Sequence, residues 1–189
     1  MKKITIITAI ALLAAAILSG CNNIAEQYVF DDTVVRAETS DGTIGGASTR
    51  LLDKEENRVH NIRLAIEKIN GTIIQPDETF SFNDKVGERN EARGFKEATA
   101  LFGREKVREV GGGVCQISTT IYQAVKNAEL EIEERHQHKR KIPYAQLGQD
   151  ATVDYDSGFD LSFRNNKGSP IKIHVSMDND HLHVTIDKM

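Results

Sequence analysis

The chain has 189 residues, the length of one domain or at most two. Its 24 Lys and Arg residues against 28 Asp and Glu residues give a formal net charge of −4, and this acidic balance argues against a nucleic-acid-binding protein. With 39% hydrophobic and 28% charged residues the chain is globular rather than disordered, and its two cysteines are too few for a small disulfide-held fold.

The first 20 residues have the pattern of a signal peptide. Lys2 and Lys3 give it a basic start, and the apolar run over residues 4–18 is shorter than the roughly 20 residues that span a bilayer. The run ends in Leu18-Ser19-Gly20-Cys21, which resembles the lipobox of bacterial lipoproteins and implies cleavage before Cys21 and a lipid on its sulfur. The alternative is an ordinary signal peptide that contains a cysteine. We therefore expect an extracytoplasmic protein, lipid-anchored to the outer face of the cytoplasmic membrane.

Residues 21–49 are polar and glycine-containing, so we interpret them as a tether, compatible with one strand at 33–37. The body then spans residues 50–189. If Cys21 carries a lipid, Cys115 has no partner for a disulfide. A lone thiol is unusual in an oxidising compartment and needs an explanation.

The body begins with apolar residues at helical spacing over 51–69, closed by the turn at Asn70-Gly71. Short strands are expected at 72–74 and 80–82, followed by a loop over 83–94 and a break at the three glycines, 111–113. A second helix is expected from Gln116 to about 129. Strands are then expected at 130–138, 151–155, 159–164, 171–177 and 181–187, the last two forming a hairpin. This order predicts an α+β fold, with helices in the N-terminal half, a cysteine-bearing helix, and then a mainly antiparallel sheet.

Cys115 lies at the first turn of the second expected helix, directly after the glycines. The helix dipole there favours the thiolate, and free backbone N–H groups over Gly113, Val114 and Gln116 can hold an oxyanion. Glycines also let a substrate approach closely. This is the layout of a cysteine acyl-transfer site. The alternative is a small buried cysteine that only packs the helix.

A thiolate nucleophile needs a base, and two histidines follow on the next expected strand. Residues two apart on a strand share a face, so His136 and His138 can point the same way, with Arg135 and Gln137 opposite. Asp150, which opens the following strand, is the preferred carboxylate to orient a histidine, ahead of Asp154 and Asp160.

The histidine pairs 136/138 and 181/183 also have metal-ligand spacing, which with Cys115 leaves a zinc site open as an alternative. However, His174, His181 and His183 fall on the face of the terminal hairpin that should meet solvent. We therefore expect neither a metal nor another cofactor.

Much of the body closely resembles the VanW family, named for an accessory protein of a vancomycin-resistance cluster. The resemblance runs from about residue 50 to 175. It is carried by Asn61-Ile62-Arg63-Leu64-Ala65, Ile69-Asn70-Gly71, Phe80-Ser81-Phe82-Asn83, Val86-Gly87, Gly111-Gly112-Gly113-Val114-Cys115-Gln116-Ile117-Ser118-Thr119-Thr120-Ile121-Tyr122, Arg135 with His138, Gly148 with Asp150-Ala151-Thr152-Val153, and Phe163-Arg164-Asn165-Asn166.

Some proteins with this domain look like L,D-transpeptidases, which join peptidoglycan stem peptides through a cysteine acyl-enzyme. The resemblance thus implies Cys115 as nucleophile and His138 as base, with Gln116 and Arg135 near the site. After His138 the sequence departs from the family, because Lys139-Arg140-Lys141 stands where members commonly have a serine.

The hypothesis from sequence is therefore an extracytoplasmic cysteine acyltransferase acting on peptidoglycan stem peptides. Cys115, His138 and Asp150 are its expected catalytic residues. Gly113, Val114, Gln116, Arg135 and His136 are its expected oxyanion- or substrate-binding residues. The alternatives are a non-catalytic envelope module that binds peptidoglycan or a wall protein, and a zinc hydrolase.

Overall fold

The computed structural model describes residues 42–102 and 105–189. The expected signal peptide, the lipid-bearing Cys21 and the expected strand at 33–37 lie outside these residues. No helix within the described residues is long and apolar enough to cross a membrane.

Helices and strands alternate along the body, and the α+β prediction is confirmed. The order differs from the expected one because a strand precedes the first helix. The elements are β1 (Thr43–Arg50), α1 (Glu56–Ile69), β2 (Ile73–Ile74), β3 (Thr79–Ser81), α2 (Phe82–Val86), a 3-10 turn η1 (Glu91–Arg93), β4 (Glu97–Phe102), β5 (Glu105–Val110), α3 (Val114–Asn127), β6 (Glu131–Arg135), β7 (Leu161–Arg164), β8 (Ile171–Met177) and β9 (His181–Lys188).

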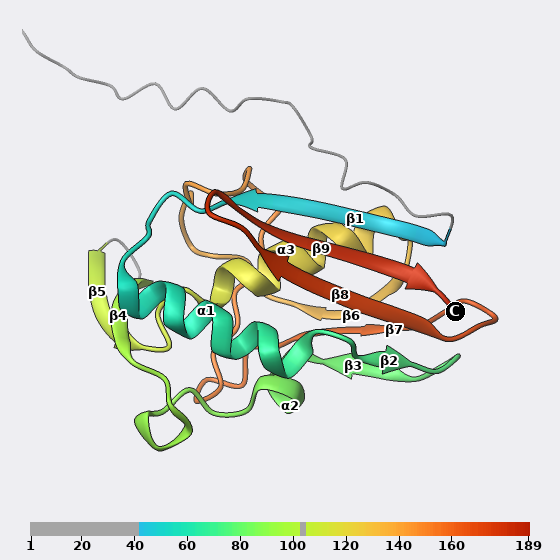
Figure 1. Ribbon diagram of the computed structural model, residues 1–189, viewed down its shortest axis with the longest axis horizontal. Helices are drawn as coiled ribbons and strands as arrows, with labels where there is room; N and C mark the ends of the chain where they lie inside the picture. The colour runs from blue at the N-terminus through green and yellow to red at the C-terminus, as the bar shows by residue number, and fades with distance from the viewer. Residues whose placement is uncertain (1–41, 103–104) are drawn as a thin grey trace, which may run out of the picture. The chain divides into compact units, whose positions relative to one another are not determined.

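The strands form antiparallel sheets, and the two larger sheets pack on α3 (Figure 1). The larger sheet has the order β1-β9-β8-β2, the second has the order β3-β7-β6, and β4 and β5 form a separate hairpin. Helix α3 contacts β1 and β9 of the larger sheet and also β6 and β7 of the second, while α1 packs against β8. The N-terminal end of α3 is thereby brought to the segment that joins β6 to β7.

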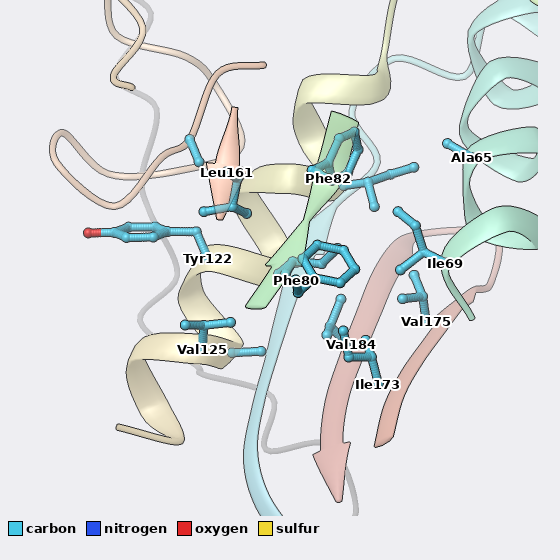
Figure 2. Packing of buried hydrophobic residues seen from close by; sticks show 14 of the residues in the cluster. Ala65, Ile69, Phe80, Phe82, Tyr122, Val125, Leu161, Ile173, Val175 and Val184 are labelled. Carbon is cyan, nitrogen blue, oxygen red and sulfur yellow. The ribbon is translucent and has the colours of Figure 1, made fainter. Parts of the chain in front are cut away.

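One face of the larger sheet is buried, as the alternating pattern of its strands requires. Along β8 and β9 every second side chain is buried, and the buried residues of the two strands lie opposite each other, as in the Val175–Val184 pair. Phe80 of β3 lies at the centre of the core, between Val125 of α3 and Ile69 of α1 (Figure 2). Its ring stacks on Phe163 of β7 at a centroid distance of 5.0 Å.

Strand β1 occupies residues that we expected to be the end of the tether. Its inward positions are Gly45, Ala47 and Thr49, which lack the large apolar residues that mark a strand in sequence. A Cβ atom at Gly45 would lie 2.6 Å from the Ala124 carbonyl oxygen of α3. Gly45 is therefore needed for close contact between sheet and helix and is no sign of a flexible linker.

Three other elements also differ from the boundaries expected from the sequence. Helix α1 begins five residues later than expected, since Leu51 follows β1 outside any helix and donates its N–H to the Asp180 carbonyl at 2.7 Å. Strand β6 ends at Arg135 instead of continuing to residue 138. The expected strand at 151–155 is reduced to two isolated bridges, His136–Thr152 and Asp154–Phe159.

Gly45→Ala tests the contact between β1 and α3. We expect it to destabilise the fold by about 1–3 kcal/mol, because the added methyl group has no space and the helix has to move. Gly168→Ala is the matched control, since nothing lies within 4 Å of its Cβ position. Urea unfolding of the body measures both variants, and equal midpoints would contradict the close packing of β1 on α3.

Candidate active site

The three glycines place the start of α3 against neighbouring backbone. Gly113 is the N-cap residue, with φ of 106° in the left-handed region that glycine tolerates best. A Cβ atom at Gly112 would lie 2.6 Å from the carbonyl oxygen of Ala98. These two glycines thus face protein atoms, so the fold itself requires them. These contacts account for the two glycines without the path for substrate that we expected them to open.

Buried polar side chains fix this turn from behind. Asn61 of α1 donates to the Gly112 carbonyl at 3.1 Å and to the Lys96 carbonyl at 2.8 Å. The Gln116 amide donates to the Arg50 carbonyl at 2.9 Å and accepts from the Arg58 guanidinium at 3.0 Å. Gln116 is 1% exposed. Because these hydrogen bonds are buried within the fold, the Gln116 side chain is not placed to bind substrate, as we had expected it to do.

Two hydroxyl groups on α3 hold the segment after residue 149 against the helix. Ser118 donates to the Ala151 carbonyl at 2.7 Å, and Thr119 accepts from the Ala151 N–H at 3.1 Å. Both side chains are fully buried. This clamp brings Asp150 and Thr152 to the first turn of α3, where Cys115 lies.

The Cys115 thiol is half-buried at that turn, 3.6 Å from the Thr152 hydroxyl and 3.4 Å from the Val153 carbonyl oxygen. Burial by itself raises the pKa of the thiol. A hydrogen bond with His138 and the charge of His138 oppose burial, and the pKa is lowered overall. Hydrogen bonds with Val153 and Thr152 add to the lowering. The site therefore favours the thiolate, which is the nucleophilic form.

His138 is held by the buried carboxylate of Asp150. The ring Nδ1 and the backbone N of His138 both lie 2.7 Å from the same carboxylate oxygen. Since a carboxylate only accepts, Nδ1 carries the proton, and Nε2 of the neutral ring is left as the acceptor nitrogen. Burial lowers the pKa of His138, but contact with Cys115 and then with Asp150 raises it overall. The structure thus brings together Cys115, His138 and Asp150, the three residues predicted from sequence to be catalytic.

Arg135 lies behind Asp150 and not beside the thiol. Its Nε donates to the Asp150 carbonyl at 2.7 Å, and its terminal nitrogen lies 3.3 Å from the carboxylate. The guanidinium also lies over the Tyr122 ring, 4.6 Å from its centroid. Arg135 is therefore a positioning residue for Asp150.

His136 does not share the position of His138, because β6 ends at Arg135 and the alternation of the strand stops there. The His136 ring lies 2.8 Å from Glu134 and stacks on Phe159 at a centroid distance of 4.3 Å. Its carbonyl accepts from the Thr152 N–H at 2.8 Å. His136 therefore supports Thr152 through its backbone, while its ring belongs to a neighbouring contact.

The backbone N–H groups at the helix start are only partly available for an oxyanion. Val114 donates to the Gly111 carbonyl at 3.2 Å and Gln116 to the Gly113 carbonyl at 3.0 Å. The Cys115 N–H donates to no acceptor within residues 42–102 and 105–189. Of this turn, the Cys115 N–H is therefore the best placed to stabilise negative charge on a carbonyl that Cys115 attacks.

The other two aspartates have separate roles. Asp160 accepts from the Ser81 hydroxyl at 2.5 Å and from the Asn83 N–H at 2.9 Å. Asp154 accepts from the Ser157 hydroxyl at 2.6 Å within its own turn. The structure agrees with the preference for Asp150 as the partner of the histidine.

Sequence reasoning missed Thr152, Tyr144 and Arg89. Thr152 was part of the run that carries the family resemblance, but its expected strand gave no reason to place it at the thiol. The pKa of Tyr144 is raised by burial and then by the negative charge of Cys115, so its phenol stays neutral beside the site. Arg89 lies in a loop without any sequence signal.

The described part of the chain contains no group of three or more His, Cys, Asp or Glu side chains arranged to hold a metal ion. His181 and His183 lie on β9, far along the chain from Cys115, and the His183 ring contacts Ser48 at 2.8 Å and Asp178 at 3.0 Å. Nothing in this geometry favours the zinc alternative.

Comparison with known proteins identifies the family. A family model described as VanW like protein matches residues 57–187. The Bacillus subtilis (strain 168) protein named Uncharacterized protein YoaR is 36% identical over 155 residues, covering 82% of this chain and 51% of the relative. Vancomycin B-type resistance protein VanW of Enterococcus faecalis (strain ATCC 700802 / V583) is 29% identical over 133 residues, covering 68% and 48%. The chain thus spans about half the length of the curated relatives it matches. No solved structure matches it.

The lowered pKa of Cys115 can be measured by alkylation with iodoacetamide against pH. Because only the thiolate reacts, we expect the rate to rise at a pH below the ~8.5 of a free thiol. His138→Ala removes the main cause of the lowering and should move the rise to higher pH. His136→Ala is the matched control and should leave it in place. A wild-type profile like that of a free thiol would contradict the pairing of Cys115 with His138.

Proposed function

This chain belongs to the VanW family, and we propose that it is a cysteine acyltransferase of the L,D-transpeptidase type that acts on peptidoglycan stem peptides. The observation that carries the proposal is the Cys115–His138–Asp150 relay at the start of α3. The name of the Enterococcus relative, a vancomycin resistance protein, supports a role in the cell wall, where that antibiotic acts.

In the first step the Cys115 sulfur attacks the carbonyl carbon between an L-centre and the following D-residue of a stem peptide. His138 Nε2 takes the thiol proton, and the Cys115 N–H stabilises the tetrahedral oxyanion. Collapse breaks the C–N bond, and His138 gives its proton to the leaving nitrogen. The D-amino acid departs, and a thioester remains on Cys115.

In the second step the amine of an acceptor stem attacks the thioester. His138 Nε2 takes a proton from that amine, the C–S bond breaks, and the thiolate is released beside the protonated imidazole. Water in place of the amine would give hydrolysis. The reaction needs no cofactor, because all proton transfers run through His138.

Asp150 and Arg135 serve the base rather than the substrate. Asp150 fixes the tautomer and the orientation of His138, as the third member of a triad does. Its carboxylate is 3% exposed, so an unpaired charge there would be costly. Arg135 and the His138 backbone N–H supply the partners that hold Asp150 in place.

We place the protein outside the cytoplasm, attached by a lipid on Cys21. The sequence Leu18-Ser19-Gly20-Cys21 after a basic, apolar leader supports this. Such an anchor would hold the site near newly made peptidoglycan at the membrane.

A non-catalytic envelope module that binds peptidoglycan or a wall protein is the competing function. It requires no acyl-enzyme, so the two functions differ in whether a stem-peptide adduct forms on Cys115.

The catalytic proposal is tested by incubating the body with defined muropeptides, followed by mass analysis of products and protein. Cys115→Ala should abolish turnover and leave the fold intact. His138→Ala should lower kcat by roughly 10²–10⁴-fold, the usual contribution of a general base, and Asp150→Asn should lower it in the same direction. His136→Ala is the control and should retain most activity. Wild-type turnover by Cys115→Ala would sink the proposal, and binding without any adduct would favour the module.

Lipidation is tested with Cys21→Ala in the full chain. We expect the variant to leave the membrane fraction or to keep its leader, because the lipid attachment point is gone. Fractionation and mass analysis of the N-terminal peptide read the result. Normal processing together with unchanged membrane attachment would show that Cys21 carries no anchor.

A further inference from the structure

Arg89 lies beside the relay, in the loop between α2 and η1. Its side chain packs against Gly111, four residues before Cys115, so that a Cβ atom there would lie 2.7 Å from the Arg89 Cβ. Its guanidinium carbon lies 6.0 Å from the centre of the Tyr155 ring. Tyr155 follows Val153, whose carbonyl contacts the Cys115 sulfur, by two residues. Arg89 thus contacts both segments that form the thiol site, at Gly111 before the helix and at Tyr155 after Val153.

One side of the guanidinium is fixed and the other is left without a partner. The first terminal nitrogen donates to the Asn83 side-chain oxygen at 2.7 Å and to the Gly87 carbonyl at 3.1 Å. The guanidinium also lies over the Phe82 ring, 5.6 Å from its centroid. The second terminal nitrogen is buried and has no hydrogen-bond partner within the described part of the chain. A buried donor of a charged group without an acceptor is costly, and an acceptor that reached this nitrogen would relieve that cost.

Arg89 lacks the ion pair that several other arginines make. Arg108, Arg135 and Arg164 each form an ion pair with a carboxylate. Among the ion pairs of the described residues none involves Arg89, although the charges of Cys115, Asp160 and Asp154 act on it. Burial lowers the pKa of Arg89, and these negative charges oppose the lowering. The guanidinium is therefore a partly desolvated cation near the nucleophile.

We propose that Arg89 binds the free carboxylate of the residue that leaves the acyl donor, and so selects donors whose scissile bond precedes the last residue. This rests on the proposed function. A planar guanidinium is suited to a carboxylate, which can accept from it through two parallel hydrogen bonds. The carboxylate of the terminal residue is only one residue beyond the attacked carbonyl. A cation that packs against the turn of Cys115 is therefore in the appropriate region.

The carboxylate site is tested first without any peptide, by alkylating Cys115 with iodoacetate and with iodoacetamide. In both reactions the thiolate forms an S–C bond and iodide leaves, and only iodoacetate carries a carboxylate. The ratio of the two rates cancels any change in the amount of thiolate. We expect Arg89→Gln to lower the ratio of iodoacetate to iodoacetamide by about tenfold or more, the effect of losing a charge-assisted hydrogen bond. Arg89→Lys keeps the charge without the planar fork and should lower it less.

Arg93→Gln is the matched control, because it removes the same charge from the neighbouring turn η1. The Arg93 guanidinium donates to the Val86 carbonyl at 3.1 Å instead of lying at the thiol turn. Its rate ratio should equal that of the wild type. An equal ratio in wild type and Arg89→Gln, with both folded by circular dichroism, would overturn the proposal, as would an equal loss in Arg93→Gln.

A second experiment uses a tetrapeptide-stem donor with a free C-terminal carboxylate and the same donor with a C-terminal amide. The wild type should prefer the acid in kcat/KM by about tenfold or more, and Arg89→Gln should lose that preference. Turnover with no preference for the acid overturns the proposal and leaves the catalytic function intact. An Arg89-dependent alkylation ratio without any stem turnover supports the carboxylate site and counts against the catalytic function instead.

Discussion

The buried carboxylate of Asp150 is the constraint on which the site depends. A carboxylate that is 3% exposed has to find donors for its oxygens inside the fold, and here Arg135 and both the backbone and the ring of His138 supply them. Arg135 is the last residue of β6 and His138 follows it, whereas Asp150 precedes β7. Their convergence therefore draws the end of β6 and the segment at 150–153 together. The hydroxyl groups of Ser118 and Thr119 then tie that segment to α3, which carries the nucleophile.

The charges of Cys115 and His138 depend on each other. His138 and Arg135 are cationic or become so, and Asp150 supplies one buried negative charge. The raised pKa of His138 and the lowered pKa of Cys115 have the same cause, since each charge stabilises the other in a partly desolvated place. Burial opposes both charges, and at each group the partner is the largest of the contributions that oppose burial. The nucleophile and base are thus one coupled pair rather than two independently tuned groups.

Sequence reasoning reached the relay but not its surroundings. Cys115 could be placed at a helix start because the apolar spacing after the glycines is regular, and the hairpin of β8 and β9 could be placed because its apolar residues alternate. Strand β1 could not, since its inward residues are small where α3 lies close. The separation of His136 from His138 was also hidden, because it depends on where β6 ends. Arg89 belongs to no helical or strand pattern in the sequence, and only the folded loop brings it to the turn of Cys115.

Most of the motif around Cys115 builds the support of the site rather than the site itself. Gln116 and Asn61 hold the turn from the protein side, and Gly112 and Gly113 make room for neighbouring backbone. Among the described residues, the Cys115 N–H and one buried terminal nitrogen of Arg89 are the groups at this turn without a hydrogen-bond partner. A nucleophile, a base and an unpaired cation around one turn are what a peptide ending in a carboxylate would require. Under the proposed function, this support holds Cys115, His138 and Asp150 in place for acyl transfer, and the proposed role of Arg89 is to select the end of the peptide that enters.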